Sequence, residues 1–150
     1  MTTEGRLPLL MIYLDTSVLV AALTREQLTE RVQHWLVDQA EGSVAISGWT
    51  RVEFAAALRF KVATRQIDES HRAVAAAQFA DIAGYGLVSW PIDAEDFEVA
   101  GSMAASEMLG LRAPDALHFA IAWRRGAALC TLDDGLRRAC VQFGHSCISP

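Results

Sequence analysis

Short apolar runs alternate with longer stretches of helical periodicity along the chain, and this alternation limits the possible folds more than any other feature. Strands are expected at Met11–Leu14, Val44–Ser47, Leu87–Ile92, Ala128–Leu132 and Ser146–Ile148. Helices are expected at Val18–Leu23, Arg25–Gln39, Thr50–Gln66, Glu69–Ala83, Ala94–Leu109, Pro114–Arg124 and Gly135–Phe143. Strands that alternate with helices are typical of βαβ units, so the sequence predicts an α/β protein built on a parallel sheet.

A single domain accounts for the 150 residues, because domains are commonly about 100 to 150 residues long. Hydrophobic residues make up 52% of the chain and charged residues 21%, a balance that excludes a disordered protein. The apolar run Leu7–Leu14 is too short to cross a bilayer, so no membrane segment is expected. Residues 1–9 are interpreted as a flexible leader, which leaves open whether Met11 is the natural start.

The net charge of −5 argues against a protein that binds nucleic acid through its overall charge. Any contact with RNA or DNA must then be local or bridged by metal ions. Lys61 is the only lysine, so arginines must supply most phosphate contacts, and a P-loop is absent. Cys130, Cys140 and Cys147 lack CxxC spacing, so we expect neither a zinc site nor a disulfide framework, but a reduced, cytoplasmic compartment.

Four acidic residues stand where the chain leaves an expected strand or enters an expected helix: Asp15, Glu53, Asp115 and Asp133. Each has an ordinary structural explanation. Asp15 and Asp133 fit helix N-caps, and Asp115 fits the first turn of a helix, where negative charge suits the dipole. Glu53 stands three residues after Thr50, in the spacing of a capping box.

The joint pattern of the four acids favours a metal site over capping. Ligands of open parallel α/β sheets bind beyond the carboxyl ends of the strands, and Asp15, Glu53 and Asp133 follow three of the expected strands. Asp115 enters from the helix that precedes the fourth strand. Clustered carboxylates repel one another unless a cation holds them, and oxygen ligands suit hard ions such as Mg²⁺ or Mn²⁺.

Several polar neighbours are candidates for a supporting role. Thr16, Ser17 and Thr131 offer hydroxyls that could orient a carboxylate or a metal-bound water, or equally hydrogen-bond a turn backbone. Asp134 is a fifth acid beside the cluster, with an exposed cap as its simpler role.

Basic residues near the acids also have two possible roles each. His118 lies one turn after Asp115 and either touches substrate or has a surface or packing role. Arg112 and Arg51 are candidate phosphate contacts, with solvated helix ends as the simpler interpretation.

Four segments together carry a family resemblance. The segment Tyr-Leu-Asp-Thr-Ser-Val-Leu, the helix-borne Glu53, the phrase Pro-Asp-Ala-Leu-His-Phe-Ala-Ile-Ala and the strand end Leu-Cys-Thr-Leu-Asp occur in this order. They resemble the PIN-domain ribonucleases, in particular the VapC-type toxins of bacterial toxin–antitoxin pairs. The likeness extends from about Met11 to the C-terminus.

The resemblance implies a fold, an activity and a set of site residues. The fold is a three-layer α/β/α sandwich with a central five-stranded, mainly parallel sheet. The activity is hydrolysis of RNA phosphodiester bonds with Mg²⁺ or Mn²⁺. Asp15, Glu53, Asp115 and Asp133 match the four catalytic acids, with Asp15, Asp115 and Asp133 as the expected metal ligands. Thr131 matches a polar position that accompanies the fourth acid.

The resemblance also implies partners, namely a small antitoxin and a second copy of the chain. The expected helix around Glu53 has Val52, Ala56 and Phe60 beside its core-facing residues, which is compatible with a shared interface.

Other acid-bearing α/β proteins fit the sequence less well. A dehalogenase-type phosphatase needs an aspartate where Ser17 stands, and a phospho-receiver domain needs a lysine at the pocket, from which Lys61 is distant. The non-enzymatic alternative is a catalytically idle PIN-like module that binds RNA or protein.

Overall fold

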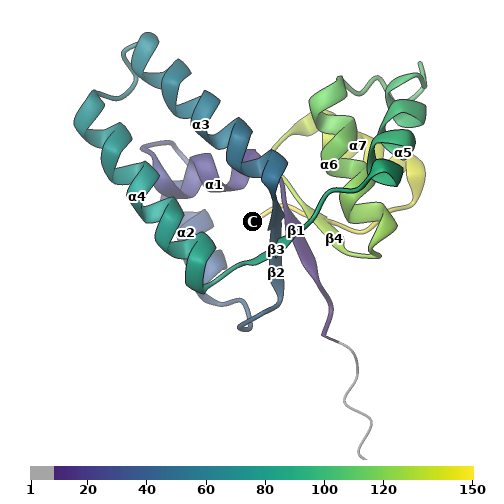
Figure 1. The fold of residues 1–150 in the computed structure, drawn as a ribbon, viewed down its shortest axis with the longest axis horizontal. Helices are drawn as coiled ribbons and strands as arrows, with labels where there is room; N and C mark the ends of the chain where they lie inside the picture. The colour runs from purple at the N-terminus through teal and green to yellow at the C-terminus, as the bar shows by residue number, and fades with distance from the viewer. Residues whose placement is uncertain (1–8) are drawn as a thin grey trace, which may run out of the picture.

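The structure is a computed structural model that describes residues 9–150 (Figure 1). Its strands are β1 (Ile12–Leu14), β2 (Val44–Ser47), β3 (Val88–Trp90), β4 (Ala128–Cys130) and β5 (Cys147–Ile148). Its helices are α1 (Thr16–Leu23), α2 (Thr29–Val37), α3 (Gly48–Ala63), α4 (Glu69–Tyr85), α5 (Ala94–Ala104), α6 (Ala113–Arg124) and α7 (Asp134–Phe143). Each expected strand and helix therefore exists, and only β2 has both of its expected ends.

The five strands form one sheet in the order β3-β2-β1-β4-β5, and every pairing is parallel. The chain builds the sheet outward from β1 to β3 and then returns to the other side of β1 to add β4 and β5. The strand order therefore reverses between β1 and β4. In open α/β sheets such a switch point is where ligands bind, beyond the carboxyl ends of the strands.

Helices cover both faces of the sheet, with α1 to α4 on one side and α5 to α7 on the other (Figure 1). The side chains of β1 show how the two layers are held. Leu14 belongs to the core that contains Phe54 and Phe79, whereas its neighbour Tyr13 belongs to the opposite core with Phe119. Full burial of one large apolar side chain stabilises the fold by about 1.5 to 3 kcal/mol. The three-layer α/β/α prediction is confirmed.

Two helix boundaries differ clearly from the sequence prediction. The helix expected from Arg25 begins at Thr29, because the Thr29 hydroxyl donates to the Thr24 carbonyl and accepts the Glu26 N–H, which holds a turn. The helix expected to reach Leu109 ends at Ala104. The chain then turns, and Gly110 reaches a positive φ of 59° that favours glycine.

The N-terminal leader lies almost wholly outside the described residues, because the description begins at Leu9, which is exposed. Within residues 9–150, no helix has both the length and the apolar character needed to cross a bilayer.

Candidate active site

Asp15 ends β1 and caps α1, and it is almost fully buried, with 3% of its surface exposed. Its Oδ1 accepts hydrogen bonds from the backbone N–H and the hydroxyl of Ser17. Its Oδ2 accepts a hydrogen bond from the Thr131 hydroxyl. Burial raises the pKa of Asp15, although the bonds from Ser17 and Thr131 oppose that rise. A buried carboxylate without a basic partner among these contacts is costly unless a cation joins it.

Thr131 connects Asp15 to Asp133. It is fully buried just after β4, and its hydroxyl oxygen accepts the backbone N–H of Asp133 at 2.9 Å while donating to Asp15. The Ser17 hydroxyl makes a second link, since it accepts the Leu132 N–H at 3.0 Å. The Thr131–Asp15 and Ser17–Leu132 bonds each join the segment after β1 to the segment after β4. They therefore fix the two strand ends that flank the switch point.

Asp115 and Asp133 line one polar cavity of about 570 Å³ with Arg112, Asp134 and Arg138. Asp133 caps α7, with its Oδ1 accepting the N–H of Leu136. Asp115 lies in the first turn of α6, after Pro114 at an early helical position. Burial and the nearby charge of Asp133 raise the pKa of Asp115. Four more apolar cavities elsewhere in residues 9–150, of about 210 to 420 Å³, are smaller and lack such a carboxylate pair.

Glu53 lies on α3 and makes its contacts with α1 and α6. Its Oε1 accepts hydrogen bonds from the Thr16 hydroxyl, at 2.8 Å, and from Nε2 of His118. Burial raises the pKa of Glu53, but the hydrogen bonds from His118 and Thr16 and nearby positive charge outweigh burial, and the net pKa lies below its usual range. Glu53 is therefore held as a carboxylate.

The structure brings all four predicted acids to the carboxyl edge of the sheet, as the contacts above show. In the described part of the chain, no three His, Cys, Asp or Glu side chains already stand in the geometry of a metal site. The donor chemistry nevertheless fits a hard divalent cation. Three carboxylate oxygens accept no hydrogen bond from described residues: Glu53 Oε2, Asp115 Oδ1 and Asp133 Oδ2. These oxygens remain open to a ligand.

Some sequence interpretations need correction. Glu53 forms no capping box with Thr50, because α3 begins at Gly48 and the box joins its N-cap Ser47 to Thr50. His118 has no surface role, since it is 1% exposed. Arg51 does not line the cavity of the acids, because its guanidinium lies over the Phe79 ring, 5.8 Å from the ring centre.

The remaining candidates lie where the sequence placed them. Arg112 is mostly exposed, with its Nη2 3.3 Å from the Asp115 carboxylate. Asp134 is exposed and pairs with Arg137. Lys61 pairs with Glu26, away from the acids, which removes the phospho-receiver alternative.

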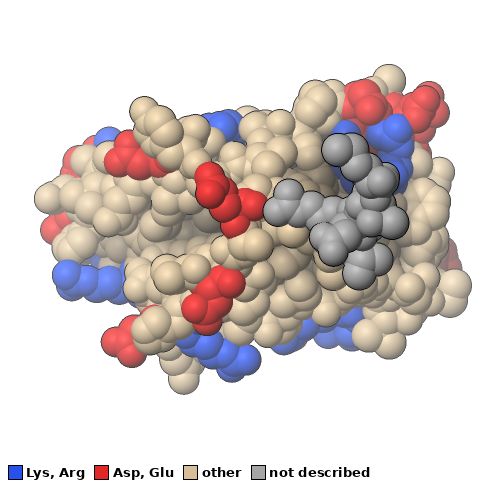
Figure 2. Space-filling model, turned by 90° about the horizontal axis from the view of Figure 1, so that it is seen from below, with Lys and Arg blue, Asp and Glu red and all other residues tan. Residues whose placement is uncertain are grey.

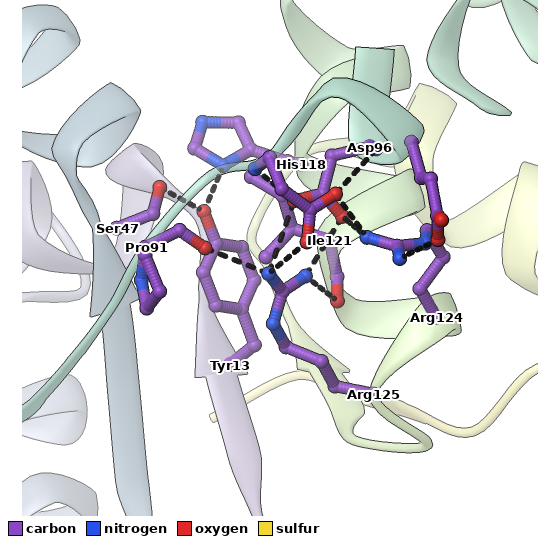
Figure 3. Close-up of polar contacts among 10 residues, drawn as sticks. Tyr13, Ser47, Pro91, Asp96, His118, Ile121, Arg124 and Arg125 are labelled. Carbon is purple, nitrogen blue, oxygen red and sulfur yellow. Dashed lines mark hydrogen bonds and ion pairs between the residues drawn. The ribbon is translucent and has the colours of Figure 1, made fainter. Parts of the chain in front are cut away.

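Sequence reasoning missed Tyr13, Ser47 and Arg138. The hydroxyls of Tyr13 and Ser47 join His118 in a buried network (Figure 3), and His118 in turn contacts Glu53. Arg138 borders the cavity of Asp115 and Asp133. A signal for Tyr13 exists, since a phenol inside an apolar strand needs a partner for its hydroxyl when buried.

The whole chain was compared with families and proteins already known. A family model for the PIN domain matches residues 12–142, which include all four acids. This chain belongs to the PIN domain family. A search of curated proteins found no match to this PIN domain.

Solved structures share the fold of this PIN domain. The Mycobacterium tuberculosis toxin VapC20, described as cleaving the sarcin-ricin loop, matches with a TM-score of 0.68 and 18% identity, covering 85% of this chain and 94% of its own. FitAcB from Neisseria gonorrhoeae matches with a TM-score of 0.67 and 24% identity, covering 92% and 96%. VapBC2 from Rickettsia felis, bound to promoter DNA, matches with a TM-score of 0.63 and 16% identity, covering 93% and 99%. These likenesses confirm the PIN fold.

Proposed function

We propose that this PIN domain is a metal-dependent endoribonuclease that hydrolyses RNA phosphodiester bonds and acts as the toxin of a toxin–antitoxin pair. The observation that carries the proposal is the buried Asp15 carboxylate, which Thr131 links to Asp133, beside the Asp133–Asp115 cavity. Capping explains Asp15 and Asp133 singly, but it gives no reason for Asp115 to share their edge. The family and the VapC structures support the same activity.

We assign the metal ligands to Asp15, Asp115 and Asp133. A bound Mg²⁺ or Mn²⁺ supplies a water of lowered pKa and offsets negative charge on the scissile phosphate. The protein's own part is to hold the ligands, and Ser17 and Thr131 do this for Asp15 by occupying both of its oxygens. Glu53 completes the set, with its Oε2 open toward the site.

RNA contact is assigned to the rim of the cavity, where Arg112 and Arg138 stand beside the acids. Guanidinium groups bind phosphate with two parallel hydrogen bonds. The opposite edge of the sheet, where the strands begin, carries acids and bases in small separate groups (Figure 2). The net charge of −5 likewise leaves RNA binding to local contacts, which favours unpaired RNA that reaches into a pocket.

Two protein partners complete the proposal. An antitoxin is supported by the VapBC structures, which are toxin–antitoxin systems. A homodimer is supported by α3, where Val52 is 59% and Phe60 58% exposed. Free Cys130, Cys140 and Cys147 are compatible with a cytoplasmic setting.

The test is cleavage of a pooled RNA substrate with Mn²⁺, with chelator as a control. Asp15→Asn and Asp115→Asn should lower the rate by about 100-fold or more, equivalent to about 2.7 kcal/mol of transition-state stabilisation. Asp38→Asn is the matched control, because Asp38 is an exposed aspartate at the end of α2. Full activity of the folded Asp15 and Asp115 variants refutes their roles. RNA binding without cleavage by the wild type identifies the idle module instead.

A further inference from the structure

A buried series of hydrogen bonds connects the start of α3 to Glu53 through two other segments. Figure 3 shows its members Ser47, Tyr13 and His118. The Tyr13 hydroxyl lies 2.8 Å from Ser47 Oγ and 2.9 Å from His118 Nδ1. The other ring nitrogen of His118 contacts Glu53 Oε1. Ser47, Tyr13 and His118 are each at most 1% exposed. Low polarity strengthens such bonds and makes their loss expensive.

The network joins the three segments that bring acids to the site. Tyr13 lies in β1, two residues before Asp15. His118 lies in α6, three residues after Asp115. Ser47 is the N-cap of α3, the helix that carries Glu53. The mutual placement of the acids on β1, α3 and α6 therefore depends on these bonds.

The contacts of His118 fit one tautomer of the neutral ring. The Glu53 carboxylate can only accept, so His118 Nε2 carries a hydrogen. In the neutral ring Nδ1 is then an acceptor, and the Tyr13 O–H donates to it. A phenol keeps its proton at neutral pH, so Tyr13 can act as this donor. The Trp90 ring lies parallel to the Tyr13 ring, 5.9 Å between centres, which limits rotation of the phenol.

Glu53 is anchored at one oxygen only. Thr16 and His118 both donate to Oε1, and no described residue donates to Oε2. The Glu53 side chain is 25% exposed, so a ligand can reach the carboxylate. A carboxylate used only for packing would not need one oxygen with two hydrogen-bond donors and the other with none.

We propose that Tyr13 and His118 are positioning residues: Tyr13 holds His118 as its Nε2–H tautomer, and His118 holds Glu53 with Oε2 toward the reacting RNA. The proposal rests on the nuclease function proposed above. Neither residue touches substrate, because both are buried. Their effect must therefore appear in the catalytic rate rather than in RNA binding.

The first test measures kcat and KM for RNA cleavage. Tyr13→Phe removes only the hydroxyl and should lower kcat by about tenfold, the equivalent of one hydrogen bond to a charged group, with KM within about twofold. His118→Ala should lose more, and His118→Gln, which keeps an N–H donor, should recover part of that loss. Adding Tyr13→Phe to His118→Ala should cause little further loss, since the series is already broken.

The control for lost buried bonding is Thr24→Val. Thr24 is buried, and its hydroxyl donates to the Val20 carbonyl away from the acids. Thr24→Val should leave kcat unchanged. An equal fall in kcat for Thr24→Val and Tyr13→Phe overturns the proposal. A Tyr13→Phe variant with the full kcat of the wild type also overturns it. The Tyr13→Phe result decides the test by itself if the His118 variants fail to fold.

The second test needs no catalysis. Nitrogen-15 NMR of the histidine side chains should show His118 protonated at Nε2 and not at Nδ1 in the wild type, with the tautomers mixed in Tyr13→Phe. Protonation at Nδ1 in the wild type overturns the proposal. If the wild type shows the expected tautomer but does not cleave RNA, the nuclease function and the catalytic role of the network are both refuted. If the wild type cleaves RNA and the variants cleave it equally well, only the positioning role is refuted.

Discussion

Thr131→Val tests whether one buried hydroxyl holds the site together. Thr131 is fully buried, donates to the Asp15 carboxylate and accepts the Asp133 N–H. A hydrogen bond to a charged group is worth about 1.5 to 3 kcal/mol, and an unpaired N–H costs about 1 kcal/mol or more. Water can reach the half-buried Asp133, so the low end applies to its N–H. We expect the free energy of unfolding to fall by about 3 kcal/mol near neutral pH.

The cost of Thr131→Val should depend on pH. Burial raises the pKa of Asp15, and the Thr131 hydroxyl holds it down, so the variant has an even higher folded-state pKa. A raised folded-state pKa means stability that is present in acid and lost as pH rises through that pKa. As pH rises, the variant therefore loses more unfolding free energy than the wild type. Its deficit should therefore be larger at neutral pH than in acid, where Asp15 is protonated in both states and the N–H contribution remains.

Urea unfolding at both pH values measures the deficit, with Thr24→Val as the matched control. The Thr24 hydroxyl bonds a neutral carbonyl, so its loss should cost about 1 kcal/mol at either pH. RNA cleavage by Thr131→Val should fall as well, because Asp15 and Asp133 lose their link. A deficit that is the same at both pH values, or no larger than that of Thr24→Val, refutes the reasoning.

Three further predictions concern metal, RNA and assembly. Protons compete with the metal, and the pKa values of Asp15 and Asp115 are raised, so calorimetric Mn²⁺ affinity should weaken as pH falls below neutral; a constant affinity contradicts this. Arg138→Ala should raise KM for RNA by about tenfold and lower the slope of log affinity against log salt concentration by about 0.7. Arg137, whose side chain pairs with Asp134, is the control, and Arg137→Ala should change neither quantity. Equal effects of the two substitutions contradict a contact between Arg138 and RNA. Phe60→Ser should halve the mass seen by light scattering, and an unchanged mass excludes this face as the dimer interface.

The sequence predicts the strands and the gathering of the acids because both depend on local patterns. Runs such as Val44–Ser47 are apolar on both faces, as strands of a covered parallel sheet must be, and that strand matches its expected bounds. The placement of Asp15 and Asp133 at one edge then follows from the parallel sheet, because both come after strands that lie side by side. Residue types and their order along the chain carry this information.

The helix ends and the support of the acids depend on contacts that a local pattern does not contain. The start of α2 is set by the Thr29 hydroxyl, which bonds backbone groups of the preceding turn. The bond between Tyr13 and His118 spans 105 positions of the chain. A phenol in one strand and an imidazole in a distant helix become partners only once the sheet has placed β1 beneath α6.

The return of the chain to β4 after β3 has a consequence for synthesis. The pocket needs Asp15 from the beginning of the chain and Thr131 and Asp133 from near its end. A ribosome therefore releases almost the entire polypeptide before the last carboxylate can join the others. Under the proposed function, the nascent fragment is therefore inactive, and a premature stop before Thr131 leaves a product without a complete site.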